Sequence, residues 1–153
     1  IGVGPAPNDD WEPRGDVTIG GAALRGIVIE PGEVPSLIDE LPVLAVAMSA
    51  AEGVSEVRGA TELRRKECDR ITCMIAELRN FGVDATELDD GFRISGGAPM
   101  CAPPVSDSHG DHRLAMSLVV AGLISDGVTR LRGTEHIDIS FPGFERLLRS
   151  LAR

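Results

Sequence analysis

The sequence predicts an α/β fold built from repeated units. Short segments of β-forming residues alternate with helical segments along the chain, an order typical of α/β domains. Two of the helical segments, 37–51 and 111–124, are apolar on nearly all sides, which is typical of buried helices. The chain also resembles itself when it is shifted by 74 positions. We therefore expect two copies of one supersecondary unit to share a core.

The composition fits one domain with an aliphatic core. The chain has 153 residues, of which 42% are apolar but only 3% aromatic. This length and apolar content favour a folded domain over a disordered chain. The net charge of −9 argues against a protein that binds nucleic acid or a membrane surface through a general basic field. The sequence shows neither a signal-peptide pattern nor an apolar run of the roughly 18 residues that span a membrane.

The cysteines indicate a reducing compartment. Cys68, Cys73 and Cys101 are odd in number and lack the spacing of a metal site. We expect them to be free thiols, buried as small apolar groups in a cytoplasmic protein. Because the chain begins at Ile1 rather than Met, we also expect it to be part of a longer protein.

The N-terminal elements are a linker and two short strands. Residues 1–15 are rich in Pro, Gly and Asp and are expected to form a linker. Segments 16–19 and 26–29 contain β-branched residues on either side of a Gly-Gly pair, so we expect a strand pair.

A buried helix and a third strand come next. Ser36 can cap a helix, and the acids Asp39 and Glu40 suit the positive end of its dipole. The helix is therefore expected to occupy 37–51. A Glu-Gly pair ends it, and 54–57 follows as a strand.

The middle of the chain predicts a second helix followed by a hairpin. A polar link at 61–67 precedes the segment 69–81, which has apolar residues at helical spacing. Gly82 is expected to terminate this helix. Segments 83–88 and 92–95 flank an Asp-Asp-Gly turn, which is typical of a β-hairpin.

The last third predicts a loop, a buried helix, a strand and an amphipathic helix. Pro and Cys interruptions indicate a loop at 96–110. The helix 111–124 and the strand 128–131 follow. Ser and Pro at 140–142 open the final helix, which is expected to extend from 141 to 151.

The internal repeat relates residues 40–63 to residues 114–137. An apolar helix, a Glu-Gly-Val-Ser turn and an Arg-Gly pair align with an apolar helix, an Asp-Gly-Val-Thr turn and a second Arg-Gly pair. Chance similarity between two Ala/Leu-rich helices is the alternative, but the matching turns disfavour it. With the strand pair at 16–29 and the hairpin at 83–95, the elements give a βαβαββ order when the strands are counted cyclically.

Two candidate parts of a functional site, one residue and one tripeptide, lie at the starts of the apolar helices. Asp39 is either a simple partner of the helix dipole or a general base at the mouth of a site. The tripeptide Asp111-His112-Arg113 is either a capping Asp with an exposed His-Arg pair or part of the same site. In the repeat register Arg113 is the counterpart of Asp39.

The third candidate is the charged run 63–70, Leu-Arg-Arg-Lys-Glu-Cys-Asp-Arg. It is either a solvated loop with weak ion pairs or an anion pocket at a helix N-terminus. In the second interpretation Arg70 supplies a bidentate guanidinium, Lys66 a point charge and Glu67 a carboxylate.

Convergence of the three segments on one face suits a small, doubly anionic substrate and proton transfer. The sequence has no nucleophile elbow, no GxGxxG motif and no P-loop, so it gives no support for nucleotide binding. The candidate residues are two acids and three cations: Asp39, Glu67, Lys66, Arg70 and Arg113.

These segments resemble a known family. The Lys-Glu-x-Asp-Arg motif at 66–70 and the Asp-His-Arg-x-Ala-Met motif at 111–116 are similar to motifs of the EPSP synthase (3-phosphoshikimate 1-carboxyvinyltransferase) family, as are 35–42 and the late Ser-Phe-Pro. Their order and intervals match as well. The resemblance implies an inside-out α/β prism made of βαβαββ units. It also implies that 16–153 is a partial C-terminal enolpyruvyl transferase domain, with the N-terminal domain absent.

The resemblance further implies a reaction and its residues. The enolpyruvyl group of phosphoenolpyruvate would pass to the 5-hydroxyl of shikimate 3-phosphate, with release of phosphate, in the cytoplasmic pathway to chorismate and the aromatic amino acids. Asp39 would handle the hydroxyl proton and Glu67 the proton at the methylene carbon. Lys66 would touch shikimate 3-phosphate, and Arg70 and Arg113 would clamp phosphoenolpyruvate. Neither a metal nor an organic cofactor is implied, and the chain alone is expected to be inactive.

One position departs from part of the family, because some members carry a Lys where this chain has Ile139. UDP-N-acetylglucosamine enolpyruvyltransferase is the alternative enzyme, but its late motif differs from Asp-His-Arg-x-Ala-Met. A non-catalytic half-enzyme that only binds ligands is the alternative of another class. Retention of all five candidate residues argues against that degenerate form.

Overall fold

The structure is a computed structural model that describes residues 2–3 and 15–151. At its N-terminal end a two-residue strand, β1 (Gly2–Val3), pairs antiparallel with β2 (Val17–Thr18). The expected linker at 1–15 lies almost wholly outside the described residues. The expected pairing of 16–19 with 26–29 is wrong, because β2 pairs with β1 while the next strand joins a different sheet.

The first repeat unit is a complete βαβαββ motif. Its sheet has the strand order β3-β4-β6-β5, with β3 and β4 parallel and the other two pairings antiparallel. The motif appears in direct chain order, so the strands need no cyclic counting. Its elements are β3 (Val28–Ile29), α2 (Leu41–Ala50), β4 (Gly53–Val57), α3 (Arg70–Asn80), β5 (Asp84–Leu88) and β6 (Gly91–Gly96).

Local signals explain the elements that carry the site. The carboxylate of Asp69 accepts a hydrogen bond from the Thr72 amide and so caps α3. After the last turn, Gly82 adopts a φ of +83°, a left-handed conformation that ends helices and that glycine adopts without strain. A five-residue 3-10 helix, η1 (Thr61–Arg65), occupies most of the expected polar link.

The expected helix at 37–51 is in fact two helices. The short α1 (Val34–Leu37) ends before a turn at residues 38–40, and α2 begins at Leu41. The cause is Pro42, which has no amide hydrogen to donate to the preceding turn, so the helical ladder cannot run through it. The expected capping role of Ser36 is wrong as well, because Ser36 lies inside α1 and donates to the Glu33 carbonyl.

The second repeat unit begins inside the expected loop at 96–110. A short strand there, β7 (Val105–Asp107), pairs in parallel with β8 (Arg130–Arg132). Strand β8 replaces the strand expected at 128–131 and begins two residues later. The helix expected at 141–151 begins only at Phe144, because Gly143 before it has a φ of +83°, outside the range of a right-handed helix. The elements are β7 (Val105–Asp107), α4 (His112–Leu123), β8 (Arg130–Arg132), η2 (Thr134–His136), α5 (Ile137–Ser140) and α6 (Phe144–Leu151).

The second strand of each parallel pair repeats with the shift of 74 seen in the sequence, while the first strand, β7, is shifted by 77 relative to β3. In the first unit β3 pairs with Glu56 and Val57, and in the second β7 pairs with Arg130 and Leu131, each 74 positions further on. The two glycines that open and follow β4 have φ values of +94° and +75°. Their counterparts, Gly127 and Gly133, have +102° and +72°. Both copies therefore use the same backbone turns, which only glycine adopts readily.

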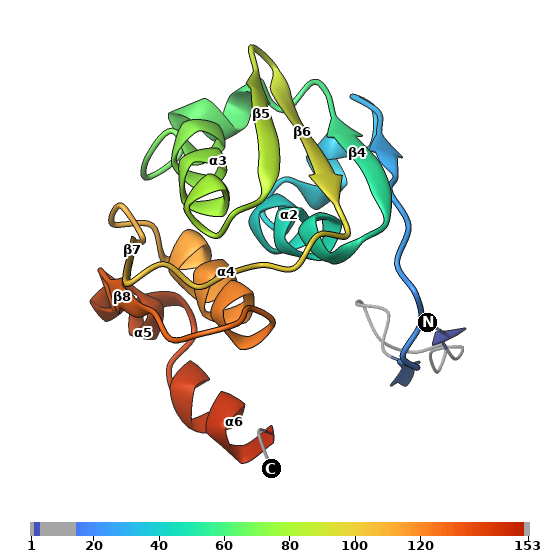
Figure 1. The fold of residues 1–153 in the computed structure, drawn as a ribbon. Coiled ribbons are helices and arrows are strands. Elements are labelled where there is room, and N and C mark those ends of the chain that lie inside the picture. Colours follow the sequence, from blue (N-terminus) through green and yellow to red (C-terminus); the bar gives the residue numbers. More distant parts are fainter. Residues whose placement is uncertain (1, 4–14, 152–153) are drawn as a thin grey trace, which may run out of the picture.

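Helices α2 and α4 lie in the interior, the four-stranded sheet lies outside them, and α6 lies at the periphery (Figure 1). Helix α2 lies between the four-stranded sheet and α4, and α3 packs against β5 and β7. The inner face of the sheet contributes Phe92, Ile94 and Val57 to the core, whereas Arg93 and Glu56 pair on its outer face. This arrangement confirms the expected fold class. No helix among the described residues is long and apolar enough to cross a membrane.

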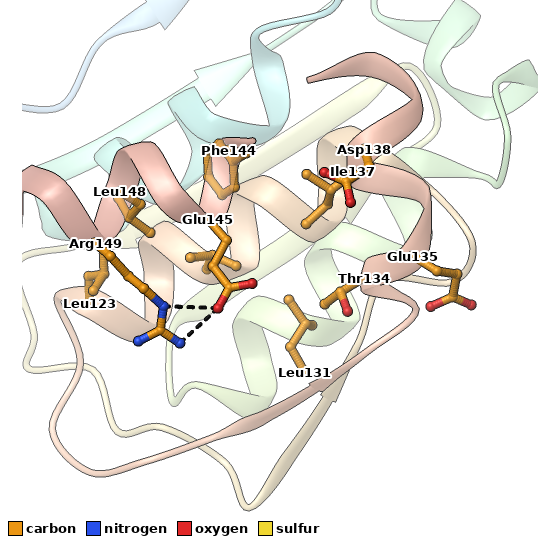
Figure 2. A pocket seen from close by; sticks show the side chains of 11 residues that line it. Leu123, Leu131, Thr134, Glu135, Ile137, Asp138, Phe144, Glu145, Leu148 and Arg149 are labelled. Carbon is orange, nitrogen blue, oxygen red and sulfur yellow. Dashed lines mark hydrogen bonds and ion pairs between the residues drawn. The ribbon is translucent and has the colours of Figure 1, made fainter. Parts of the chain in front are cut away.

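The second unit leaves an apolar groove of about 800 Å³ open beside β8 (Figure 2). Leucines of α4, β8 and α6 point into it, and the ion pair between Glu145 and Arg149 lies at its rim. In the first unit the corresponding surface is covered by the hairpin β5–β6. Within residues 15–151 the second unit has no such hairpin.

Candidate active site

Arg70 is the centre of the candidate site. It is the first residue of α3 and only 2% exposed, and its guanidinium binds three carboxylates from three different segments. Its Nε donates to Asp111 at 2.6 Å, Nη1 to Asp39 at 3.2 Å and Nη2 to Glu67 at 2.7 Å. The fork geometry of arginine allows this, since its five N–H groups point in fixed directions.

Asp39 lies among three cations. Its carboxylate is 3.2 Å from Arg70, 3.3 Å from Arg113 and 3.9 Å from Lys66. It belongs to the turn between α1 and α2, not to the start of a continuous helix as expected. Arg113 also donates to the Asp39 carbonyl at 3.0 Å. The repeat counterparts 39 and 113 are therefore in direct contact.

Glu67 joins the same cluster from the loop between η1 and α3. One of its carboxylate oxygens binds Arg70, and the other lies 3.5 Å from Nδ1 of His112. Lys66, its chain neighbour, is held by Glu62 at 3.0 Å on the outer side. The structure thus brings all five candidate residues together.

The loop that carries Lys66 and Glu67 is anchored by Arg64. Its guanidinium donates to Asp69 and to Glu87 on β5, both at 2.8 Å, and to the carbonyls of Leu88 and Asp89. The loop is therefore tied to the capped end of α3 on one side and to the hairpin on the other.

Helix N-termini meet at the site, but their own caps occupy several of their amides. Asp111 caps α4 by accepting from the amides of Arg113 and Leu114, as Asp69 does for α3 with Thr72. An anion at this site would therefore be held mainly by the side-chain cations, with the helix dipoles adding to the favourable field.

The buried pair Arg70–Asp111 is ionised on both sides. Burial alone would lower the pKa of Arg70, but Asp111, Glu67 and Asp39 together outweigh it, so the pKa of Arg70 lies above its ordinary value. Burial would likewise raise the pKa of Asp111, but Arg70 and the α4 amides hold it below its ordinary range. The pair is therefore a fixed support at neutral pH.

The cysteines take no part in this chemistry. Burial raises the pKa of the Cys68 thiol far above its ordinary value, and burial also raises that of Cys73. Neither is a thiolate nucleophile at neutral pH. All three cysteines are free, but Cys101 is exposed, so the expectation that all are buried is wrong. Cys101 faces outward, whereas the preceding residue, Met100, faces the core.

Sequence reasoning missed two residues of the cluster. The sequence leaves Asp111 as either a helix cap or part of the site, and the structure shows both, since its Oδ1 caps α4 while its Oδ2 binds Arg70. His112 is not among the five candidate residues, yet it is partly buried and faces Glu67. The sequence feature that could have indicated both residues is the tripeptide Asp111-His112-Arg113.

With three cations and three central carboxylates within contact distance, the cluster can bind a multiply charged anion and exchange protons with it.

Comparison with known proteins assigns this fold and this cluster of residues to a family. A family model described as EPSP synthase (3-phosphoshikimate 1-carboxyvinyltransferase) matches residues 9–148. The chain belongs to this family.

Individual relatives give the same result. The 3-phosphoshikimate 1-carboxyvinyltransferase of Akkermansia muciniphila is 49% identical over 94% of this chain and 33% of that protein. The Geobacillus kaustophilus protein of the same name is 41% identical over 99% of the chain and 36% of its own length. The chain therefore spans about a third of the curated relatives it matches.

Solved structures support the fold. An EPSP synthase structure from Acinetobacter baumannii superposes with a TM-score of 0.91 at 39% identity and covers 97% of this chain and 35% of that one. An enolpyruvyl transferase from Streptomyces tendae superposes with a TM-score of 0.66 at 24% identity over 98% of this chain and 32% of that one, a likeness of fold alone.

Proposed function

We propose that the chain is part of an enzyme that transfers the enolpyruvyl group of phosphoenolpyruvate to the 5-hydroxyl of shikimate 3-phosphate in the cytoplasm. The observation that carries the proposal is the convergence of the Lys66–Arg70 motif with Asp39 and Arg113 around one buried guanidinium. Family membership supports the reaction, and the free thiols fit a reducing compartment.

The cluster suits the addition step. Asp39 accepts the proton of the 5-hydroxyl as its oxygen bonds to C2 of phosphoenolpyruvate, and Glu67 delivers a proton to C3. In the elimination step Glu67 takes a proton back from C3, the bond between C2 and the phosphate oxygen breaks, and Asp39 returns its proton to the departing phosphate. Two carboxylates that contact the same cation can take complementary donor and acceptor roles.

Substrate anions would bind by exchange with internal partners. Lys66 and Arg113 are both partly exposed and pair with Asp39 and with the outer acids Glu62 and Glu40. Such exposed pairs are weak, so a phosphate or carboxylate can replace them. Arg70 remains fixed by Asp111, and phosphoenolpyruvate would replace Asp39 at its Nη1.

We further propose that the described domain is partial and that a β-hairpin of the remaining polypeptide covers the groove beside β8. Positions Val119, Leu123 and Leu131 correspond, 74 residues earlier, to Ala45, Ser49 and Val57, all of which are fully buried beneath the first unit's hairpin. Leu123, by contrast, is 58% exposed. About two thirds of the relatives' length lies outside this chain and can supply the hairpin.

Strand pairing in the first unit defines what the hairpin should look like. Ser55 and Val57 of β4 lie opposite Ile94 and Phe92 of β6. The covering strand should therefore pair antiparallel with β8 and place apolar side chains opposite Thr129 and Leu131.

Leu123→Asp in the complete enzyme is expected to lower the free energy of unfolding by about 3 kcal/mol or more, because it buries a charge in an apolar site. Val54→Asp is the matched control. Val54 is 55% exposed in this chain, much like Leu123, but it lies on the outer face of the sheet, where no hairpin is expected to cover it. Val54→Asp should cost under about 1 kcal/mol. Urea denaturation measures both, and equally small losses would contradict the covering hairpin.

The reaction is tested by phosphate release with both substrates. We expect turnover from the complete enzyme and none from the 153-residue chain alone, because a third of the enzyme supplies only part of the substrate contacts. Full activity of the chain alone would disprove the partial-domain proposal. Absence of turnover from the complete enzyme would disprove the reaction.

A further inference from the structure

Helix α3 presents a second buried charged residue on the face that carries Arg70. Glu77, two turns later, is only 5% exposed, and it contacts none of the five candidate residues. Burial of a carboxylate is unfavourable unless hydrogen-bond donors compensate it, so its partners indicate what it does.

Among the described residues, the hydrogen-bond partners of the Glu77 carboxylate come from one short segment. Its Oε2 accepts from the Ser106 hydroxyl at 2.5 Å and from the Asp107 amide at 3.3 Å. Its Oε1 lies 3.2 Å from Nε2 of His109. Three successive contacts therefore fasten the end of β7 and the loop after it to α3.

This loop holds a strained conformation. His109 has a φ of +54° and is the one non-glycine residue of the described chain with a positive φ. Strained backbone persists only where its surroundings fix it. Here Asp107 accepts from the His109 amide at 2.8 Å, and the buried hydroxyl of Ser108 donates to the Gly133 carbonyl at 2.9 Å.

The strained loop leads directly into the site. The Asp111 amide donates to the Ser108 carbonyl at 3.0 Å, and Asp111 then caps α4 and binds Arg70. Arg113 follows in the first turn of α4. Helix α3 thus holds this segment at two points, with Glu77 at the start of the loop and Arg70 at its end.

We propose that Glu77 is a positioning residue that fixes the 107–110 loop and thereby sets the place of Asp111 and Arg113 in the site. The proposal rests on the proposed function for its kinetic consequence, but the positioning itself does not. A carboxylate suits the role because its two oxygens can accept from all three neighbours at once, whereas an alanine would leave Ser106, Asp107 and His109 without this anchor.

The test is Glu77→Ala in the complete enzyme. A displacement of about 1 Å at a site can lower a rate about 100-fold, so we expect kcat/KM for phosphoenolpyruvate to fall about 10- to 100-fold. The KM for shikimate 3-phosphate should change less than about twofold, because Lys66 lies in a loop that Arg64 anchors separately. Glu77→Gln keeps two of the three contacts and should restore most of the loss.

Hydrogen exchange without substrate gives a readout that does not depend on the reaction. In Glu77→Ala the amides of 107–113 should exchange faster, while those of β5 and β6 stay unchanged. Arg79→Ala is the control on the same helix, because Arg79 donates to the Ala85 carbonyl away from the loop. Arg79→Ala should leave the exchange of residues 107–113 and the kcat/KM for phosphoenolpyruvate at the wild-type level.

If Glu77→Ala does not fold, His109→Ala removes one of the three contacts from a partly exposed position and should shift both readouts in the same direction. Wild-type exchange at 107–113 or unchanged phosphoenolpyruvate kinetics in the folded variants would overturn the proposal. A wild-type enzyme with no turnover would instead refute the proposed function, and the exchange result would still decide the positioning.

Discussion

Arg70→Lys is expected to abolish most activity and to destabilise the fold, although it conserves the charge. A lysine has one ammonium group and cannot reach Asp111, Asp39 and Glu67 together, as the guanidinium does. Asp111 is fully buried, so losing its partner leaves an unpaired carboxylate inside the protein. Breaking such a buried pair costs about 3–5 kcal/mol. The kcat/KM for phosphoenolpyruvate should fall at least about 100-fold, because the loss of charge-assisted contacts adds to the misplacement.

Arg93→Lys is the matched control for this substitution. Arg93 pairs with Glu56 on the outer face of the sheet and is half exposed. An exposed pair contributes little to stability, so this variant should be near wild type in stability and rate. Urea denaturation and initial rates at varied phosphoenolpyruvate separate the two effects. Equal, small losses in both variants would mean that Arg70 is an ordinary ion-pair residue.

The fold could be predicted well where local signals and long-range pairing agree. The β5–β6 hairpin follows from its Asp-Asp-Gly turn, and α3 follows from the helical spacing of its apolar residues and from Gly82 at its end. The repeat predicted two related units because the same glycine turns recur. Strand β7 was missed because three residues are too few to show a period, and its pairing with β8 is set by the rest of the unit.

The sequence predicts which residues form the site better than it predicts the contacts between them. Charged residues at helix starts in a mostly acidic chain indicated Asp39, the 63–70 run and Arg113. Nothing local showed that one oxygen of Asp111 caps a helix while the other binds Arg70 on a different one. Such a contact depends on how α3 and α4 pack, which a single sequence does not display. The roles of the five residues in catalysis remain predictions.

Asp39→Ala and Glu67→Gln in the complete enzyme are expected to lower kcat by about 100- to 10,000-fold each, the usual contribution of a general acid or base. The two variants should differ in the KM for phosphoenolpyruvate. Asp39 competes with substrate anions for Lys66, Arg70 and Arg113, so its removal should leave the KM for phosphoenolpyruvate unchanged or lower. A merely structural role would raise KM instead, because the cations would lose their alignment.

Glu67→Gln preserves the shape of the side chain and an oxygen that can accept from Arg70, but an amide cannot deliver a proton to C3. Its kcat should fall with little change in either KM. Glu62→Gln is the control, since Glu62 contacts Lys66 from an exposed position and has no proposed role in proton transfer. Solvent deuterium incorporation at C3 of recovered phosphoenolpyruvate measures the proton step directly. Wild-type incorporation in Glu67→Gln would assign that proton to another group, of which His112, 3.5 Å from Glu67, is the nearest candidate.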